Sequence, residues 1–217
     1  MSTLRVSSIK NASSATGGLD IAADGSVTGA LPSPNRNLLY NGAMQVAQRG
    51  TSTTGITTEN YYTADRWLLA INSLGTWTQD LQTDAPTGSG FRRSLRMLCT
   101  TADAAPAAGD TLILIQKLEG QDLQRIRKGT SSAQQLTLSF WVKTNRTGTY
   151  VVELEDSDNA RRISTSYSIA AGESGNWVKR SLTLPADTTG VLDNDANASL
   201  LVLFWLGAGS IFLPLAV

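Results

Sequence analysis

Alternating apolar and polar positions dominate the second half of the chain. In the segment 136–142 every second residue is apolar, and Trp141 falls on the polar side of the alternation. This period of two predicts a strand with one buried face. The polar residues 145–148 predict a turn, so we expect the strand over 150–155 to be the hairpin partner of 136–142.

The same alternation, bounded by Gly, Asn, Asp or Pro, predicts seven further strands. They cover 64–71, 76–81, 94–100, 111–118, 163–169, 177–184 and 200–206. Within 163–169, Tyr167 shares its parity with Ile163 and Ile169 and should face inward. The one helical candidate, 121–127, is too short to be more than a connecting turn. About nine strands fit two packed sheets, so we predict an all-β, jelly-roll-like antiparallel β-sandwich.

Residues 1–36 differ from the rest. Short apolar pieces are separated here by small polar residues, and two brief alternating pieces surround Asp24 and Gly25. Such a segment cannot bury a core alone. Pro32 and Pro34 predict a stiff, extended linker. The expected organisation is an N-terminal attachment arm with its Pro linker over 1–36, followed by one sandwich over 37–217.

Composition narrows the function. The 217 residues include 18 basic and 18 acidic side chains, no histidine and a single cysteine. A net charge of zero, with no segregation visible along the sequence, argues against a nucleic-acid partner. The lack of histidine excludes Ser-His-Asp and Cys-His hydrolases and histidine-ligated zinc. Cys99 cannot form an intrachain disulfide, and we expect it to be a small buried side chain.

Neither end predicts a membrane role. The N-terminal sequence has no apolar run behind its charges, so we expect synthesis in a cytoplasm without a signal peptide. The uncharged run 200–217 barely reaches the length of a membrane span and is interrupted by Gly207, Gly209 and Pro214. We interpret it as a buried strand and a turn, without membrane insertion.

Catalytic and cofactor motifs are absent or out of context. The spacing S-x-x-K occurs at residues 7–10, but in a terminal arm instead of on a helix within a pocket, so we interpret it as chance. No phosphate-binding loop, dinucleotide-binding fingerprint or nucleophile elbow occurs. The sequence predicts no cofactor.

One acidic segment begins like a calcium-binding loop. Asp193, Asp195 and Asn197 have the right spacing, but Ala198 and Phe204 stand where the loop needs glycine and glutamate. A solvated acidic turn is therefore favoured over a calcium site, which stays an open alternative.

The same two interpretations apply to Asp156 and Asp158, and a solvated turn is again favoured. Glycoside hydrolysis needs only two suitably spaced carboxylates, but among 18 acidic residues the sequence singles out no pair. We therefore predict no catalytic and no metal-ligating residue.

Tryptophans are the best candidates for binding, because an exposed aromatic face is a platform for a sugar ring. Trp67 and Trp205 sit in continuous apolar runs and are expected in the core. Trp77, Trp141 and Trp177 are the candidates for ligand binding or a subunit contact, with core packing as the alternative.

Three ordered blocks resemble one family. Residues 37–67, NLLYNGAMQVAQRGTSTTGITTENYYTADRW, match the pattern N-[LI]-[LI]-x-N-G-x-M-x-[IV]-x-Q-R-G followed by A-D-R-W. The stretch from QKLEGQDLQRIRKG to TYVVEL and the stretch from NWVKRSLTLPADTTG to LFWLGAGS fit the same family. Over about residues 37–210 the chain thus resembles bacteriophage tail-fibre and minor structural proteins.

The resemblance implies a sandwich similar to the jelly-roll of carbohydrate-binding modules. It also implies a homotrimeric, non-enzymatic protein of the virion tail, with an N-terminal arm docked to tail or baseplate proteins. The sandwich would contact the host surface, where the ligand would be a glycan stacked on exposed aromatics. Attachment would rest on the apolar residues of the arm, namely Leu4, Val6, Ile9, Leu19, Ile21 and Val27.

Two alternatives remain open. One is a head-decoration or baseplate component without a receptor role, and the other is a glycan depolymerase. The chain also departs from the family at 211–217, where further strands would be expected. The sequence is therefore either naturally short or one part of a longer product.

Overall fold

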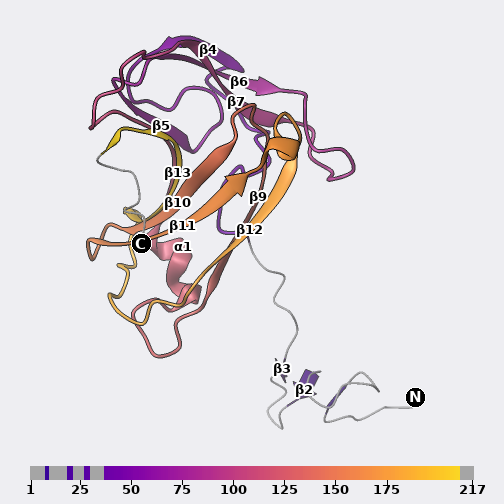
Figure 1. Cartoon of the computed structure of the whole chain (residues 1–217). Coiled ribbons are helices and arrows are strands. Elements are labelled where there is room, and N and C mark those ends of the chain that lie inside the picture. Colours follow the sequence, from indigo (N-terminus) through magenta and orange to yellow (C-terminus); the bar gives the residue numbers. More distant parts are fainter. Residues whose placement is uncertain (1–7, 10–18, 22–26, 30–36, 211–217) are drawn as a thin grey trace. The chain divides into compact units, whose positions relative to one another are not determined.

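The computed structural model describes residues 8–9, 19–21, 27–29 and 37–210 (Figure 1). Backbone contacts divide the chain into two units, Met1–Asn37 and Leu38–Val217. Every paired strand of the described part runs antiparallel to its neighbour. The predicted class, an all-β antiparallel sandwich, is confirmed for the second unit.

The first unit contains a small sheet in the order β1-β2-β3. Its strands are β1 (Ser8–Ile9), β2 (Leu19–Ile21) and β3 (Val27–Gly29). Ile9 is opposite Leu19, and Ile21 is opposite Val27, so four of the predicted attachment positions are register partners. The remaining residues named for the arm and linker lie outside the described residues: Leu4, Val6, Ser7, Lys10, Asp24, Gly25, Pro32 and Pro34.

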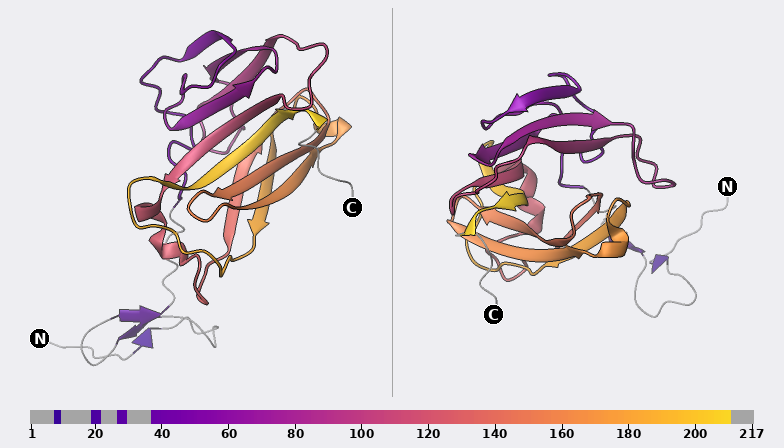
Figure 2. Two further views of the ribbon diagram at one scale, coloured as in Figure 1. Left: turned by 90° about the vertical axis from the view of Figure 1, so that its left-hand side faces the viewer. Right: turned by 45° about the horizontal axis from the view of Figure 1, so that its top comes forward.

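A five-stranded sheet forms one layer of the second unit, in the order β11-β10-β13-β8-β5 (Figures 1 and 2). Its strands are β5 (Trp67–Asn72), β8 (Thr111–Glu119), β10 (Gly148–Asp156), β11 (Arg161–Ile169) and β13 (Ala198–Ala208). Short helical turns connect strands at both ends of the unit: α1 (Gly120–Leu123), η1 (Gln124–Ile126) and η2 (Ala171–Glu173). The first two confirm the helical turn expected over 121–127.

The opposing layer is split into two smaller sheets. One is the β12-β9 pair and the other has the order β4-β6-β7, at the top of Figure 1. Their strands are β4 (Ser52–Ile56), β6 (Thr76–Gln82), β7 (Ser94–Thr101), β9 (Leu136–Val142) and β12 (Val178–Leu184). Each of two core clusters contains residues of one smaller sheet together with residues from the same face of the five-stranded sheet. Both smaller sheets therefore pack on that face.

The larger core cluster lies between β9-β12 and the five-stranded sheet. Phe140 of β9 meets Tyr167 of β11 edge-on, with ring centroids 5.1 Å apart, and Phe204 of β13 at 5.2 Å. Such edge-to-face pairs add to the burial of apolar area. The inward face of Tyr167 is thus confirmed, and so is the alternation within 136–142.

The predicted hairpin between 136–142 and 150–155 is wrong. β9 pairs with β12, whereas β10 pairs with β11 and β13. Both strands have an apolar face, and these faces meet across the core instead of lying side by side in one sheet. Local alternation predicts each strand correctly, but it does not determine which strand is the partner.

Two central strands are apolar on both faces. In β13, Leu200 and Val202 belong to the large core cluster, whereas Leu203 packs on the opposite face with Ile113 and Ile115 of β8. This two-sided packing explains the continuous apolar run over 200–206. No helix of the described residues is long and apolar enough to cross a membrane.

Two burial predictions are wrong for reasons of position. Cys99 is exposed, because it lies in the exposed half of β7, which is an edge strand. Ile163 has the inward parity of Tyr167 but is 40% exposed, because it lines the cavity at one open end of the sandwich.

The motif at 37–67 is a structural connection. The fully buried amide of Gln116 accepts from Tyr40 N and donates to Tyr40 O, both at 2.7 Å. The side-chain amide of Asn41 donates to the backbone carbonyl of Asp65, and the backbone carbonyl of Asn41 accepts from the Trp67 indole. The residues that carry the family resemblance therefore hold this segment to β5 and β8.

Candidate functional site

Two of the three candidate tryptophans lie at the same end of the β9-β12 pair. We call this region the tryptophan end and define it as Trp141, Lys143, Trp177, Lys179 and Asp84. Trp141 of β9 is opposite Lys179 of β12, and Trp177 immediately precedes β12, whose Val178 is opposite Val142. Diagonal neighbours on one face of such a pair are about 7–8 Å apart, within reach of aromatic side chains.

Strand parity directs these side chains outward. Phe140, Val142 and Val178 pack in the large core cluster. Because neighbouring residues of a strand point to opposite faces, Trp141 and Lys179 belong to the outer face. Both tryptophans are half-buried and Lys179 is exposed.

Asp84, from the loop between β6 and β7, fixes one of the two indoles. Its Oδ1 accepts from Trp177 Nε1 at 2.9 Å, and its Oδ2 accepts from Lys143 Nζ at 2.6 Å. The Lys143 ammonium also lies 6.0 Å from the centroid of the Trp177 ring. These hydrogen bonds hold the pKa of Asp84 below its usual value, and the bond from Lys143 has a larger effect than the bond from Trp177. The Trp177 indole is thus oriented before any ligand arrives.

Two further hydrogen bonds hold the three segments of this end together. Ser94 Oγ donates to Asp84 O at 2.7 Å and closes the base of the β6–β7 loop. Gly175 N donates to Thr144 O at 2.8 Å and ties the segment before β12 to the turn after β9. The tryptophan end is therefore built on backbone segments that are hydrogen-bonded to one another.

A row of hydroxyl groups continues the outer face away from Trp141. Ser139 and Ser181 are 3.0 Å apart across the two strands, and Thr137 and Thr183 follow, all of them exposed. Indole faces can stack on the apolar face of a sugar ring, and hydroxyl and ammonium groups can hydrogen-bond its substituents. This arrangement suits a polar ligand with flat apolar faces.

The other tryptophans lie elsewhere. Trp77 packs in the cluster between β4-β6-β7 and the large sheet, and its indole donates to Leu74 O at 2.6 Å. Trp67 is 3% exposed and Trp205 packs on the other face of the five-stranded sheet, so both predicted core positions are confirmed. The structure places Trp141 and Trp177 on the same face at one end of the β9-β12 pair, and Trp77 lies in another cluster.

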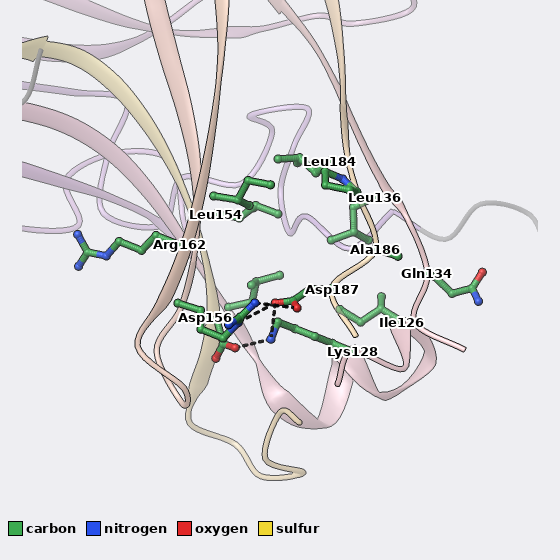
Figure 3. Close-up of a pocket in the computed structure, with 14 residues that line it drawn as sticks. Ile126, Lys128, Gln134, Leu136, Leu154, Asp156, Arg162, Leu184, Ala186 and Asp187 are labelled. Atoms are coloured by element: carbon green, nitrogen blue, oxygen red, sulfur yellow. Dashed lines mark hydrogen bonds and ion pairs between the residues drawn. The ribbon is translucent and has the colours of Figure 1, made fainter. Parts of the chain in front are cut away.

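A cavity of about 300 Å³ lies at the opposite end of the β9-β12 pair, which we call the cavity end. Figure 3 shows Lys128 reaching between Asp156 and Asp187. Lys128 Nζ is 2.5 Å from Asp156 Oδ2 and 3.1 Å from Asp187 Oδ2. It also donates to the carbonyl oxygens of Thr189 and Gly190, both at 2.9 Å.

This network corrects the expectation of a solvated turn at Asp156, which is 2% exposed and ion-paired. Asp187 also accepts two hydrogen bonds from Arg161, both at 3.0 Å. Hydrogen bonding to Arg161 is the main cause that lowers the pKa of Asp187 to about 2, and the other donors around it add to the effect. A carboxyl group with such a pKa stays ionised at neutral pH and cannot donate a proton. The charges at this end hold loops in place.

Glu153 and Glu155 alternate along β10 on the outer face of the five-stranded sheet. Burial raises the pKa of Glu153, and this rise is opposed by Arg162 and by the Trp205 indole. Arg162 contacts both carboxylates, at 3.7 Å and 3.1 Å. Figure 3 shows Arg162 directed away from the cavity. A carboxyl group whose pKa is raised by burial is the kind that can act as a general acid, and the sequence did not single out Glu153.

The acidic segment at 193–197 forms local bonds. Asp195 accepts from its neighbour Asn197, and the backbone N of Asp193 donates to Asp158 Oδ2 at 2.9 Å. Among the described residues, no group of three or more Cys, Asp or Glu side chains is placed to hold a metal ion.

Comparisons with known proteins give no family. No family model and no curated protein matches the chain. Among solved structures, the enzymatically active domain of tailspike protein 4 of bacteriophage CBA120 is 15% identical over 80% of this chain and 20% of that chain, with a TM-score of 0.41.

Two further solved structures show a similarly weak likeness. The CBM22-1-GH10 modules of Clostridium thermocellum xylanase 10B are 17% identical over 71% of this chain, and the MgGH51 α-L-arabinofuranosidase is 16% identical over 75%. Their TM-scores are 0.35 and 0.40, and the match spans 26% and 25% of those chains. No residue or function is carried over from these three structures.

Proposed function

We propose that this protein is a structural component of a phage virion, a tail fibre or fibre-like appendage that binds a host-surface glycan without turnover. In this proposal the first unit docks to tail or baseplate proteins and the sandwich projects toward the host. The observation that carries the glycan-binding role is the pair Trp141 and Trp177 on the outer face of β9-β12, where Asp84 orients the Trp177 indole. The family resemblance at 37–210 supports the virion role.

Binding is tested with the purified full-length protein and bacterial envelope polysaccharides in affinity electrophoresis. We expect Trp141→Ala and Trp177→Ala each to weaken binding about tenfold, because each removes one stacking surface. Trp77→Phe is the matched control, since that side chain packs in another cluster. Equal binding by the wild type and all three variants would contradict a role of the tryptophan end in glycan binding.

Docking through the first unit is supported by the register of its sheet. The four partner positions Ile9, Leu19, Ile21 and Val27 are all apolar, and a small sheet of this kind gains stability by adding strands from a partner. We expect Leu19→Asp with Ile21→Asp to abolish incorporation into virions while the circular dichroism of the sandwich stays unchanged. Normal incorporation would contradict the docking role.

The homotrimer is tested by light scattering on the full-length protein and on a chain that begins at Asn37. A trimer that becomes a monomer without residues 1–36 supports assembly through the first unit. A monomer in both cases favours a head-decoration or baseplate component, whose place on the particle would then be decided by immunogold labelling.

Glu153 and Glu155 favour one second candidate, a glycan depolymerase. Burial raises the pKa of Glu153, and Glu155 lies on the same face of β10, although Arg162 contacts both carboxylates. Release of reducing ends from envelope polysaccharide by the wild type, and its loss in Glu153→Gln, would favour this candidate over the non-catalytic role.

A further inference from the structure

The tryptophan end gathers positive charge in a chain whose net charge is zero. Three segments meet there: 83–93, 141–147 and 171–181. Together they contain two acidic and six basic residues. The six are Arg92, Arg93, Lys143, Arg146, Lys179 and Arg180. The fold therefore creates a charge segregation that the order of residues along the chain does not show.

Both acids of this region are already neutralised. Asp84 pairs with Lys143 at 2.6 Å, and Glu173 pairs with Arg180 at 2.6 Å. Hydrogen bonds hold the pKa of Glu173 below its usual value, and the bond from Arg180 has the largest effect. Both acids thus stay ionised and engaged at neutral pH, and they leave the other cations of the region uncompensated.

The remaining four cations have no ion-pair partner among the described residues. They are Arg92, Arg93, Arg146 and Lys179, of which Arg93 is half-buried and the others are exposed. Lys179 matters most, because it is directly opposite Trp141 and its neighbours along the chain on that face are Trp177 and Ser181. An ammonium beside a stacking surface favours an anionic group on the stacked ligand.

We propose that the ligand of the tryptophan end is an acidic polysaccharide, one whose sugars carry carboxylate or phosphate groups. This inference rests on the proposed glycan-binding function and names the class of glycan. Trp141 and Trp177 would stack on sugar rings, and Lys179, Arg92 and Arg146 would attract the anionic substituents. Two acidic side chains within the region and a row of hydroxyls favour a sparsely charged polysaccharide over a nucleic acid.

The test compares charged and neutral forms of one backbone. Polygalacturonate and its fully methyl-esterified form probe carboxylates, and phosphomannan with its dephosphorylated form probes phosphates. We expect the full-length protein to bind at least one charged form at least tenfold more tightly than its neutral counterpart in 50 mM salt. This preference should diminish strongly at 500 mM salt, because the charges are exposed.

Variants separate charge from stacking. We expect Lys179→Gln and Arg92→Gln each to weaken binding of the charged form roughly two- to fivefold and to leave any binding of the neutral form unchanged. Lys117→Gln is the control, since Lys117 is an exposed lysine of β8 away from this end.

The outcomes distinguish the two proposals. Equal, salt-independent binding of charged and neutral forms, lost in Trp141→Ala, would overturn the acidic ligand and keep the glycan-binding function. Binding of neither form would contradict both. A single-stranded oligonucleotide that binds more tightly than every charged polysaccharide would overturn the acidic glycan in favour of a nucleic acid.

Discussion

At the cavity end of the β9-β12 pair, the side chain of Lys128 is 9% exposed and its ammonium contacts two carboxylates and two carbonyls. At the tryptophan end, Lys143 is 36% exposed with one carboxylate partner, and Lys179 is exposed without an ion pair in the described residues. The two ends of the β9-β12 pair therefore differ in how their lysines are placed: one is buried and fully paired, and the others are exposed with one ion-pair partner or none. Buried, saturated charges position loops, whereas exposed, unsaturated charges are available to a ligand.

The largest expected effect contrasts two adjacent residues of β9. Phe140→Ala should lower the free energy of unfolding by about 4 kcal/mol, because it removes a core ring that contacts Tyr167 and Phe204. Trp141→Ala, on the outer face, should cost about 1 kcal/mol. Urea unfolding of both variants measures the difference. Equal losses would mean that Trp141 is also a core residue.

A somewhat smaller effect is expected at Lys128. Lys128→Met should destabilise the protein by about 3 kcal/mol, since it leaves the 2%-exposed Asp156 without its cation. Lys143→Met at the tryptophan end should cost less than about 1 kcal/mol, because that ion pair is exposed. Chemical denaturation at pH 7 compares them, and a larger loss for Lys143→Met would contradict the division between the two ends.

Strand existence could be predicted from the sequence, but strand partners could not. The alternation around Phe140 located β9 and its inward face, and it placed Trp141 outside. β4 (Ser52–Ile56) was missed because all of its residues except Ile56 are polar or small. Gly55, at φ +70°, interrupts its pairing with β6 near Trp77. Which strands pair depends on contacts across the core that no local pattern encodes.

The site could be predicted in part. Parity pointed to Trp141, but nothing local to Trp177 indicated that Asp84, 93 positions earlier, would bind its indole. The positive region was also invisible in sequence order, because its three segments are separated by long strands. Asp156 was misread as a surface residue since its partner, Lys128, comes from a different loop.

The pH dependence of stability should differ between Asp187 and Glu153. The pKa of Asp187 is lowered from 3.8 to about 2 by Arg161, so its contribution is present above about pH 4 and is lost as the pH falls toward 2. The stability difference between wild type and Asp187→Asn should therefore be constant above pH 5 and shrink below pH 4. Urea midpoints between pH 2 and 7 measure it, and a constant difference down to pH 2 would contradict the ion pair.

The smallest effect, of opposite sign, is expected at Glu153. Burial raises its pKa above the ordinary 4.5, so the ionised form destabilises the fold as the pH rises through the raised value. Glu153→Gln should unfold at a slightly higher temperature than the wild type at pH 7 and lose that advantage below pH 4.5. A variant that is less stable at pH 7 would show that the contact with Arg162 outweighs burial.

The most direct test of the tryptophan end uses the indole N–H signals of the protein's five tryptophans in nitrogen–proton correlation spectra. Each signal is assigned by a single Trp→Phe variant, and the protein is titrated with oligogalacturonate and with envelope oligosaccharides. The account predicts that the Trp141 and Trp177 signals shift together and saturate, while those of Trp67, Trp77 and Trp205 stay in place. Saturable shifts confined to those other three tryptophans, or no shift with any of these glycans, would contradict it.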